Sequence, residues 1–204
     1  ELTGQGFKIK ENHDQINGLG DGYVYIAIRR SDGRVQKPVT TATTVFAMDT
    51  GNGSSTVPAF DSTFTVDMRI GKNTGSSHDW YLGTRLMYQK HVRPNSTGGD
   101  TAGSWSKFTY SLGEGANWTS AYHGWMWRRT AGFDVVSYTG NGSNVHGDNS
   151  HPHSLGQVPE MIWIKSRSDA THWTMSHKGL NGGTNPWQYT MSLNNTWAEG
   201  ADTN

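Results

Sequence analysis

The architecture of this chain is most visible in one strand and the turn that ends it, Phe133-Asp134-Val135-Val136-Ser137-Tyr138-Thr139-Gly140-Asn141-Gly142. Aromatic and β-branched residues dominate the first part, which predicts a β-strand. Asn141-Gly142 predicts a tight turn, because both residue types accept a positive φ angle. The pentapeptide that starts at Thr139, Thr-Gly-Asn-Gly-Ser, also occurs as residues 50–54. This identity indicates an internal repeat.

Other anchors of the repeat return in the same order. Residues 7–30 match residues 108–129, each with an aromatic start, a Gly-rich middle and a strand that ends in Arg-Arg. Val57-Pro58 returns as Val158-Pro159. The offsets between matched anchors run from 89 to 101 residues, and loops rich in Gly, Ser and Asn absorb the differences. We therefore expect units of about 100 residues.

The frame of this repeat predicts three parts. Residues 1–44 hold the closing strands of a preceding unit and a linker, residues 45–130 form a complete unit, and residues 131–204 form the opening part of a further unit. We expect the chain to be an excerpt of a longer polypeptide. Its last part is completed either by residues 7–30 of a neighbouring copy or by a strand further along the same chain. The residues of this inter-unit strand are Tyr23, Tyr25, Ile26, Ile28, Arg29 and Arg30.

Composition narrows the function classes. Lys plus Arg and Asp plus Glu both number 17, so no overall field attracts nucleic acid or an anionic membrane. The chain has no Cys, which excludes disulfides and thiolate zinc sites. Nine Trp, eight Tyr and six Phe supply the buried area instead. We expect no cofactor, no nucleic-acid partner and no membrane partner.

The hydrophobic pattern has a period of two rather than 3.6 almost wherever it can be recognised, which favours strands over helices. Besides the stretch quoted above, strands are predicted over residues 23–28, 45–48, 64–70 and 161–165. No stretch of ten or more residues has the pattern of an amphipathic helix. The fold class predicted is all-β, with tandem β-sandwich modules of the jelly-roll or lectin-like kind.

Two stretches of the chain resemble a known family, residues 127–142 and residues 153–165. The second stretch contains Val158-Pro159-Glu160 between a turn and a strand. They resemble a repeat module of large virion proteins of marine tailed phages, especially cyanophages, with the pattern GFDVVTYTGNG, SHGLG and VPE. The resemblance implies a non-enzymatic structural protein of the virion, such as a tail fibre, a tail protein or a capsid-surface component. Its expected partners are copies of itself or other virion proteins, and its expected location is the extracellular particle. The resemblance implies no catalytic residues.

Several side chains have a chemical interpretation that competes with a structural one. Imidazole and carboxylate groups within eight residues could bind a divalent metal, although their loop is rich in Gly, Asn and Pro; they are His146, Asp148, His151 and His153. The motifs His78-Asp79-Trp80 and His172-Trp173 are interpreted as strands or turns with a packed Trp. A polysaccharide depolymerase would need two carboxylates at a fixed separation. The candidates occur singly, and they are Asp61, Asp67, Asp79, Glu114, Asp134 and Glu160.

Binding of a host surface glycan without hydrolysis is the main alternative function. Exposed aromatic rings stack on sugar rings, and a dense aromatic cluster offers such rings; its members are Trp118, Tyr122, Trp125 and Trp127. Strand alternation places Trp125 and Trp127 on one face and Tyr122 on the other. If the chain is only a spacer, we expect its Trp residues to be buried. If it binds sugar, we expect at least two Trp residues to be exposed in one groove.

Overall fold

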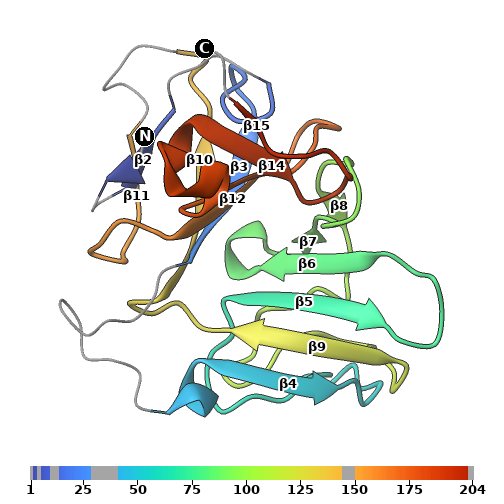
Figure 1. Ribbon diagram of the computed structural model, residues 1–204. Coiled ribbons are helices and arrows are strands. Elements are labelled where there is room, and N and C mark those ends of the chain that lie inside the picture. The colour runs from blue at the N-terminus through green and yellow to red at the C-terminus, as the bar shows by residue number, and fades with distance from the viewer. Residues whose placement is uncertain (1, 4–5, 10–13, 29–40, 144–149, 202–204) are drawn as a thin grey trace. The chain divides into compact units, whose positions relative to one another are not determined.

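A computed structural model describes residues 2–3, 6–9, 14–28, 41–143 and 150–201 (Figure 1). The fold is all-β, and the strands pair in antiparallel sheets, as the sequence predicts. Within the described residues the helical elements are short 3-10 turns: η1 (Ala42–Thr44), η2 (Arg85–Met87), η3 (Leu180–Gly183) and η4 (Pro186–Gln188). None of the helices found there is long and apolar enough to cross a membrane.

The strands follow in chain order. They are β1 (Leu2–Thr3), β2 (Gly6–Lys8), β3 (Gly22–Ile28), β4 (Phe46–Thr50), β5 (Met68–Asn73), β6 (Trp80–Thr84), β7 (Lys90–His91), β8 (Thr101–Ala102), β9 (Tyr122–Trp127), β10 (Phe133–Thr139), β11 (Ser150–Pro152), β12 (Met161–Ser166), β13 (Thr174–His177), β14 (Tyr189–Ser192) and β15 (Gly200–Ala201). One predicted strand is displaced, since β5 begins at Met68 and not at Phe64. Phe64 and Val66 instead bury their side chains in a hydrophobic core.

The contacts divide the chain into two units. Unit 1 comprises Glu1–Pro38, Thr97–Gly99 and Thr130–Asn204, and unit 2 comprises Val39–Ser96 and Asp100–Arg129. The sequence assigned residues 1–44 to a preceding unit, but the structure groups residues 1–38 with residues 130–204. The physical reason is strand pairing, because β3 lies between β10 and β12 in one sheet.

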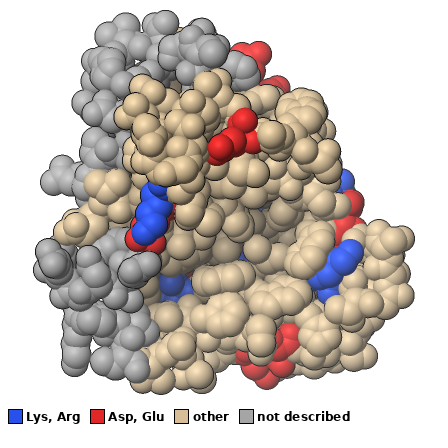
Figure 2. Space-filling model, viewed as in Figure 1, with Lys and Arg blue, Asp and Glu red and all other residues tan. Residues whose placement is uncertain are grey.

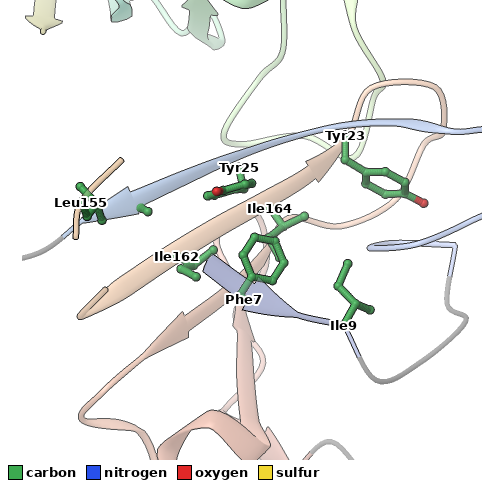
Figure 3. Close-up of a cluster of buried hydrophobic side chains, with 8 residues drawn as sticks. Phe7, Ile9, Tyr23, Tyr25, Leu155, Ile162 and Ile164 are labelled. Atoms are coloured by element: carbon green, nitrogen blue, oxygen red, sulfur yellow. The ribbon is translucent and has the colours of Figure 1, made fainter. Parts of the chain in front are cut away.

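The main sheet of unit 1 has the strand order β10-β3-β12-β13-β14-β15. In β3 all residues from Tyr23 to Ala27 are buried, which is typical of a central strand covered on both faces. One face of β3 meets a core to which Phe7, Tyr25, Leu155 and Ile162 contribute (Figure 3). β2 adds Phe7 to this core while it pairs with β11.

The main sheet of unit 2 has the order β4-β9-β5-β6. Gly124 and Met126 of β9 face the core, where Met126 is fully buried and a Cβ on Gly124 would collide with the Phe60 ring. The rest of this core consists of Ala59, Phe60, Phe64, Val66, Phe108 and Trp118. Because side chains alternate along a strand, the neighbours of Gly124 and Met126 in β9 project from the opposite face of the sheet.

The repeated pentapeptide has the same local geometry in both units. The Asn52 side chain accepts a hydrogen bond from the Ser54 amide at 2.8 Å, and Asn141 accepts one from Ser143 at 3.0 Å. The glycine that follows each Asn has a positive φ angle, 76° at Gly53 and 67° in the second copy. The prediction is therefore confirmed in part: the Gly of each copy is left-handed, whereas the Asn keeps a negative φ angle and forms a side-chain turn instead.

Candidate functional site

The aromatic residues proposed for glycan stacking lie on two different faces of unit 2. Trp118 is buried in the core, and Tyr122 packs against that core with its ring 4.7 Å from the Trp118 ring. Trp125 and Trp127 alternate with the inward-facing residues of β9, so they project from the outer face and are half-buried. The structure therefore removes Trp118 from an accessible surface and leaves Trp125 and Trp127 as candidates.

The outer face also carries an aromatic residue that the sequence interpretation placed in a packed environment. Trp80 of β6 is 39% exposed, and its ring stacks on Trp125 with centroids 5.6 Å apart and planes at 29°. The Lys72 ammonium lies 5.8 Å from the Trp80 ring centroid. Met48 of β4 lies opposite Trp125 in the register and is 67% exposed. We call Met48, Lys72, Trp80 and Trp125 the aromatic face.

Polar side chains border the aromatic face at the start of β6. The Asn95 side-chain amide donates to the Asp79 carboxylate at 2.9 Å, and its oxygen accepts the Trp80 amide at 3.1 Å. Arg93 pairs with the same carboxylate at 3.3 Å, and both side chains of this pair are partly exposed. Apolar rings beside exposed carboxylate, amide and guanidinium groups match the two surfaces of a sugar ring, its C–H face and its hydroxyls.

The two Trp residues of the related motifs have opposite environments. Trp173 is fully buried, as expected for a packed Trp, whereas Trp80 is exposed. For Trp80 the predicted strand is confirmed and the ring packs on Trp125, but the side chain stays partly exposed, because the motif specifies a strand but not what covers each face of it. Because side chains alternate along β6, Trp80 lies on the outer face of the sheet. Its ring lies beside Trp125 because β5 pairs with β6, which the sequence pattern does not predict.

A buried polar cluster lies inside unit 2. Arg69 and Glu114 form an ion pair with neither side chain exposed. Burial raises the pKa of Glu114 to about 7, while Arg69 and a hydrogen bond from the Lys107 amide favour the charged carboxylate. His91 is also buried between aromatic rings, and burial together with nearby Arg charges lowers its pKa to about 4. Perturbed groups of this kind occur at catalytic sites and in structural cores.

The cluster has the features of a structural core. The Arg69 guanidinium lies 4.4 Å from the Trp118 ring centroid and donates to the Tyr81 carbonyl at 3.3 Å. Because Glu114 and Arg69 are fully buried and His91 is 3% exposed, these groups have no surface at which a substrate could be contacted. What the cluster provides is a charged pair held among aromatic rings.

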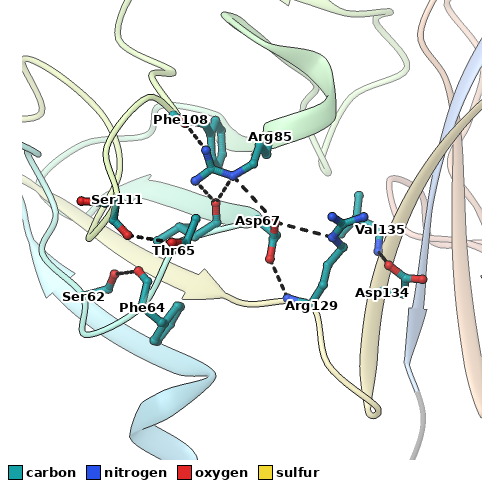
Figure 4. A network of polar contacts seen from close by, with 11 residues as sticks. Ser62, Phe64, Thr65, Asp67, Arg85, Phe108, Ser111, Arg129, Asp134 and Val135 are labelled. Atoms are coloured by element: carbon teal, nitrogen blue, oxygen red, sulfur yellow. Dashed lines mark hydrogen bonds and ion pairs between the residues drawn. The ribbon is translucent and has the colours of Figure 1, made fainter. Parts of the chain in front are cut away.

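Each carboxylate considered for glycoside hydrolysis interacts with a different set of neighbouring groups. Asp67 lies 3.7 Å from Arg85 and 3.5 Å from Arg129, and it accepts the Arg129 backbone amide at 2.8 Å (Figure 4). Asp134 accepts both the amide and the hydroxyl of Ser154. Asp79 belongs to the border of the aromatic face, Glu114 to the buried cluster, and Glu160 pairs with Lys178 at 2.5 Å. The remaining candidate, Asp61, donates its backbone amide to the Asp49 carboxylate at 2.7 Å.

The His-rich loop is only partly described. His146 and Asp148 lie outside the described residues, as do Arg29 and Arg30 of the predicted inter-unit strand. The His151 ring stacks on Tyr138 with centroids 3.8 Å apart, and burial lowers its pKa. His153 accepts the Leu155 amide at 3.3 Å. Within the part of the chain that is described, no group of three or more His, Cys, Asp or Glu side chains is arranged to hold a metal.

The other residues predicted for the inter-unit strand all belong to β3. Tyr23, Tyr25 and Ile26 are fully buried, and Ile28 at the end of the strand is partly exposed. The Tyr25 hydroxyl donates to the Pro152 carbonyl at 2.9 Å. These residues therefore complete a sheet, and they do so for unit 1 of the same chain.

On the face shown in Figure 2, the described Lys, Arg, Asp and Glu side chains are scattered among uncharged ones, and neither sign forms a broad patch. An extended polyanion would need a continuous basic surface. This face therefore offers local ionic contacts rather than a general electrostatic attraction.

Residues 119–204 match the sequence profile of a family described as a domain of unknown function, DUF7483. The matched segment includes β9, which pairs within unit 2, and the strands β10 to β15, which belong to unit 1. It therefore includes strands of both structural units and also crosses the boundary between residues 130 and 131 that the sequence repeat predicts. No curated protein and no solved structure matches the chain.

Proposed function

We propose that this chain is a non-enzymatic structural component of a phage particle, in a tail fibre, a tail or the capsid surface. The observation that supports it is the recurrence of one sheet pattern, β10-β3-β12-β13 in unit 1 and β4-β9-β5-β6 in unit 2. In each unit a strand distant in sequence is inserted beside the strand that leads into Thr-Gly-Asn-Gly-Ser. Repeated modules of this kind suit rigid display and self-assembly.

The mechanism of such a component is multivalent contact from a rigid scaffold. Antiparallel pairing and buried aromatic residues hold each unit together without disulfides. Many copies on one particle turn weak individual contacts into tight binding through effective concentration. The complete burial of Glu114 and Arg69 supports a role without catalysis, because a catalytic group must touch its substrate.

Localisation in purified particles tests this proposal. Antibodies raised against the chain would be applied to density-purified phage particles and to the soluble fraction of the same lysate. We expect immunogold label on the particle at a repeated position, and chain-derived peptides at constant stoichiometry in mass spectra of the particles. Recovery of the chain only in the soluble fraction would overturn the proposal.

A second candidate function is recognition of a host surface glycan, which the aromatic face favours. Trp80 and Trp125 provide apolar rings, and Asp79 and Asn95 provide hydrogen-bonding groups at the same end of the sheet. A pair of stacked aromatic rings contributes about 1 kcal/mol beyond its buried area, and we expect a Trp stacked on a sugar ring to contribute a similar amount. Binding of this module alone would therefore be weak, and it would depend on many copies per particle.

Glycan binding can be measured with immobilised host polysaccharide and the purified chain. Trp80→Ala is expected to reduce the bound fraction about fivefold, by loss of a stacking ring. Trp197→Ala in unit 1 is the matched control, because Trp197 is 65% exposed but lies in the other unit. Equal effects of the two substitutions would remove the aromatic face as the binding surface.

A further inference from the structure

The inserted strands β3 and β9 are equivalent members of the two units. Gly22 of β3 lies opposite Thr139, and His123 of β9 lies opposite Thr50. Thr50 and Thr139 both begin the repeated pentapeptide. Gly22 and His123 are 101 residues apart, which is also the spacing of the repeat anchors Phe7 and Phe108. We call β3 and β9 the closing strands of their sheets.

The two closing strands reach their sheets from opposite directions along the chain. β9 follows β4, β5 and β6, whose sheet it completes. β3 precedes β10 and β12, and the whole of unit 2 lies between them in the sequence. β9 therefore closes a sheet whose other strands precede it in the sequence, whereas β3 closes a sheet whose other strands follow it.

The segment around β3 contributes much of the core of unit 1. Residues 6–9 and 14–28, which we call the closing segment, supply five of the eight buried residues in that core: Phe7, Ile9, Tyr23, Tyr25 and Ala27. Leu155, Ile162 and Ile164 supply the remaining three. Figure 3 shows Phe7 from β2, Tyr23 and Tyr25 from β3, and Ile162 and Ile164 from β12 in this core. Without the closing segment, this core would lose most of its apolar surface.

Polar contacts also join the closing segment to the opening part of unit 1. The buried Asn17 side-chain amide donates to the Ser143 carbonyl at 2.6 Å and accepts the Asn141 amide at 3.2 Å. The Tyr138 hydroxyl donates to the Ile16 carbonyl at 2.8 Å. Removal of the segment would break these hydrogen bonds and would expose the edges of β10 and β12. The space between β10 and β12, which we call the slot, therefore requires an occupant.

We propose that the closing segment is exchangeable, so that the slot of one copy accepts the closing segment of a second copy of this chain. The contacts within a filled slot are the same in both cases, and the choice between them depends on local concentration. Reciprocal exchange between two copies closes into a dimer, whereas exchange in one direction leaves a free closing segment and an open slot at the ends and links copies head to tail. This inference rests on the proposed function, for which it supplies the mode of self-assembly.

The register provides a direct test, because the chain has no native Cys. Chains with Gly22→Cys alone are mixed with chains carrying Thr139→Cys alone, unfolded, refolded together and oxidised. The two positions are opposite each other in the register, and a Cβ on Gly22 would meet no atom closer than 3.9 Å. A mixed disulfide forms in register only if the closing segment of one copy occupies the slot of another. Intact mass and non-reducing electrophoresis measure its yield.

The matched control is the equivalent pair of unit 2, His123→Cys mixed with Thr50→Cys. At high protein concentration we expect the mixed disulfide of the first pair to exceed that of the control about tenfold, and to decrease on dilution. The double variant Gly22→Cys with Thr139→Cys carries both cysteines in one chain, and a disulfide within that chain shows that the two positions pair as in the register. The pair Val24→Cys and Ser137→Cys repeats the test further along β3 if the first fails to fold.

Two outcomes would overturn the inference. One is a double variant that closes only within its own chain at all concentrations, and the other is a yield for the first pair equal to that of the control. Both are measured on the purified protein, whereas the proposed function is tested on particles. Immunogold label without exchange would discard strand exchange and keep the particle role. Strand exchange without immunogold label on the particles would discard the particle role and keep strand exchange.

Discussion

Glu114 and Arg69 form an ion pair in the core of unit 2, although 45 positions separate them in the sequence and neither side chain reaches solvent. Burial raises the pKa of Glu114 and lowers that of Arg69, and their mutual attraction opposes both shifts. The backbone amide of Lys107 donates a hydrogen bond to the Glu114 carboxylate at 3.0 Å. Each charge is therefore stabilised by the other, and removal of both side chains lowers the stability by a different amount from removal of only one.

Substitution of one member of this pair should destabilise unit 2 strongly. Measured above about pH 7, where Glu114 is ionised, Arg69→Met alone is expected to lower the free energy of unfolding by about 3–5 kcal/mol, because it leaves the Glu114 carboxylate buried without a counter-charge. The double substitution Arg69→Met with Glu114→Leu should cost clearly less, since no charge remains. Hydrogen exchange of peptides from residues 58–73 and 103–127 measures both effects. A double variant less stable than Arg69→Met alone would contradict this account.

The raised pKa of Glu114 predicts a dependence of stability on pH. Its pKa is about 7 in the folded chain and 4.5 ordinarily, so the folded state holds this proton more tightly than the unfolded state does. The contribution to stability is full below about pH 4.5 and is lost as the pH rises through about 7. Exchange rates in unit 2 at pH-corrected time points should show this loss. In Glu114→Gln the corresponding slope should be absent.

His91 predicts a slope of the opposite sign. Burial, then Arg93 and Arg69, lower its pKa from 6.5 to about 4. The unfolded state therefore binds the proton more tightly, and the contribution of His91 is present above about pH 6.5 and lost as the pH falls through about 4. His91→Phe keeps an aromatic ring beside Tyr81 and Trp105, and it should flatten the loss on the acid side. An unchanged acid slope in this variant would show that other groups cause it.

The first glycine of the repeated pentapeptide should tolerate no side chain in either unit. A Cβ on Gly51 would lie 2.3 Å from the Trp118 carbonyl oxygen, and one on Gly140 would lie 2.5 Å from the Gly18 carbonyl oxygen. Because backbone atoms cannot move away as a side chain can, each Gly→Ala substitution should cost about 1–3 kcal/mol.

Urea denaturation combined with hydrogen exchange assigns each effect to its unit. Gly51→Ala should accelerate exchange in β9, and Gly140→Ala should accelerate exchange in β3, because these glycines lie against the residues that lead into the closing strands. Gly200→Ala is the control, since a Cβ at this position would have no atom within 4 Å. Equal effects at all three glycines would indicate a general loss of backbone freedom instead of a collision.

Local sequence patterns were sufficient for the fold class and for several strands. Period two with aromatic and β-branched residues predicted β3, β10 and β12 close to their observed bounds. The same alternation placed Trp125 and Trp127 on one face of β9, as the observed register does. The aromatic face was incomplete in the sequence analysis, because Trp80 joins Trp125 through the pairing of β5, β6 and β9 and not through sequence proximity.

The sequence by itself determined the all-β class, the turns at Asn-Gly and the period of the repeat, because these depend on neighbouring residues and on the geometry of a strand. The tertiary structure alone decided that β3 closes the sheet of unit 1, that Glu114 meets Arg69, and that Trp80 is exposed while Trp173 is buried. Strand alternation defines two faces and two edges, but it carries no information about which distant segment covers them. That choice follows from the burial of apolar surface and the pairing of backbone groups over the whole chain.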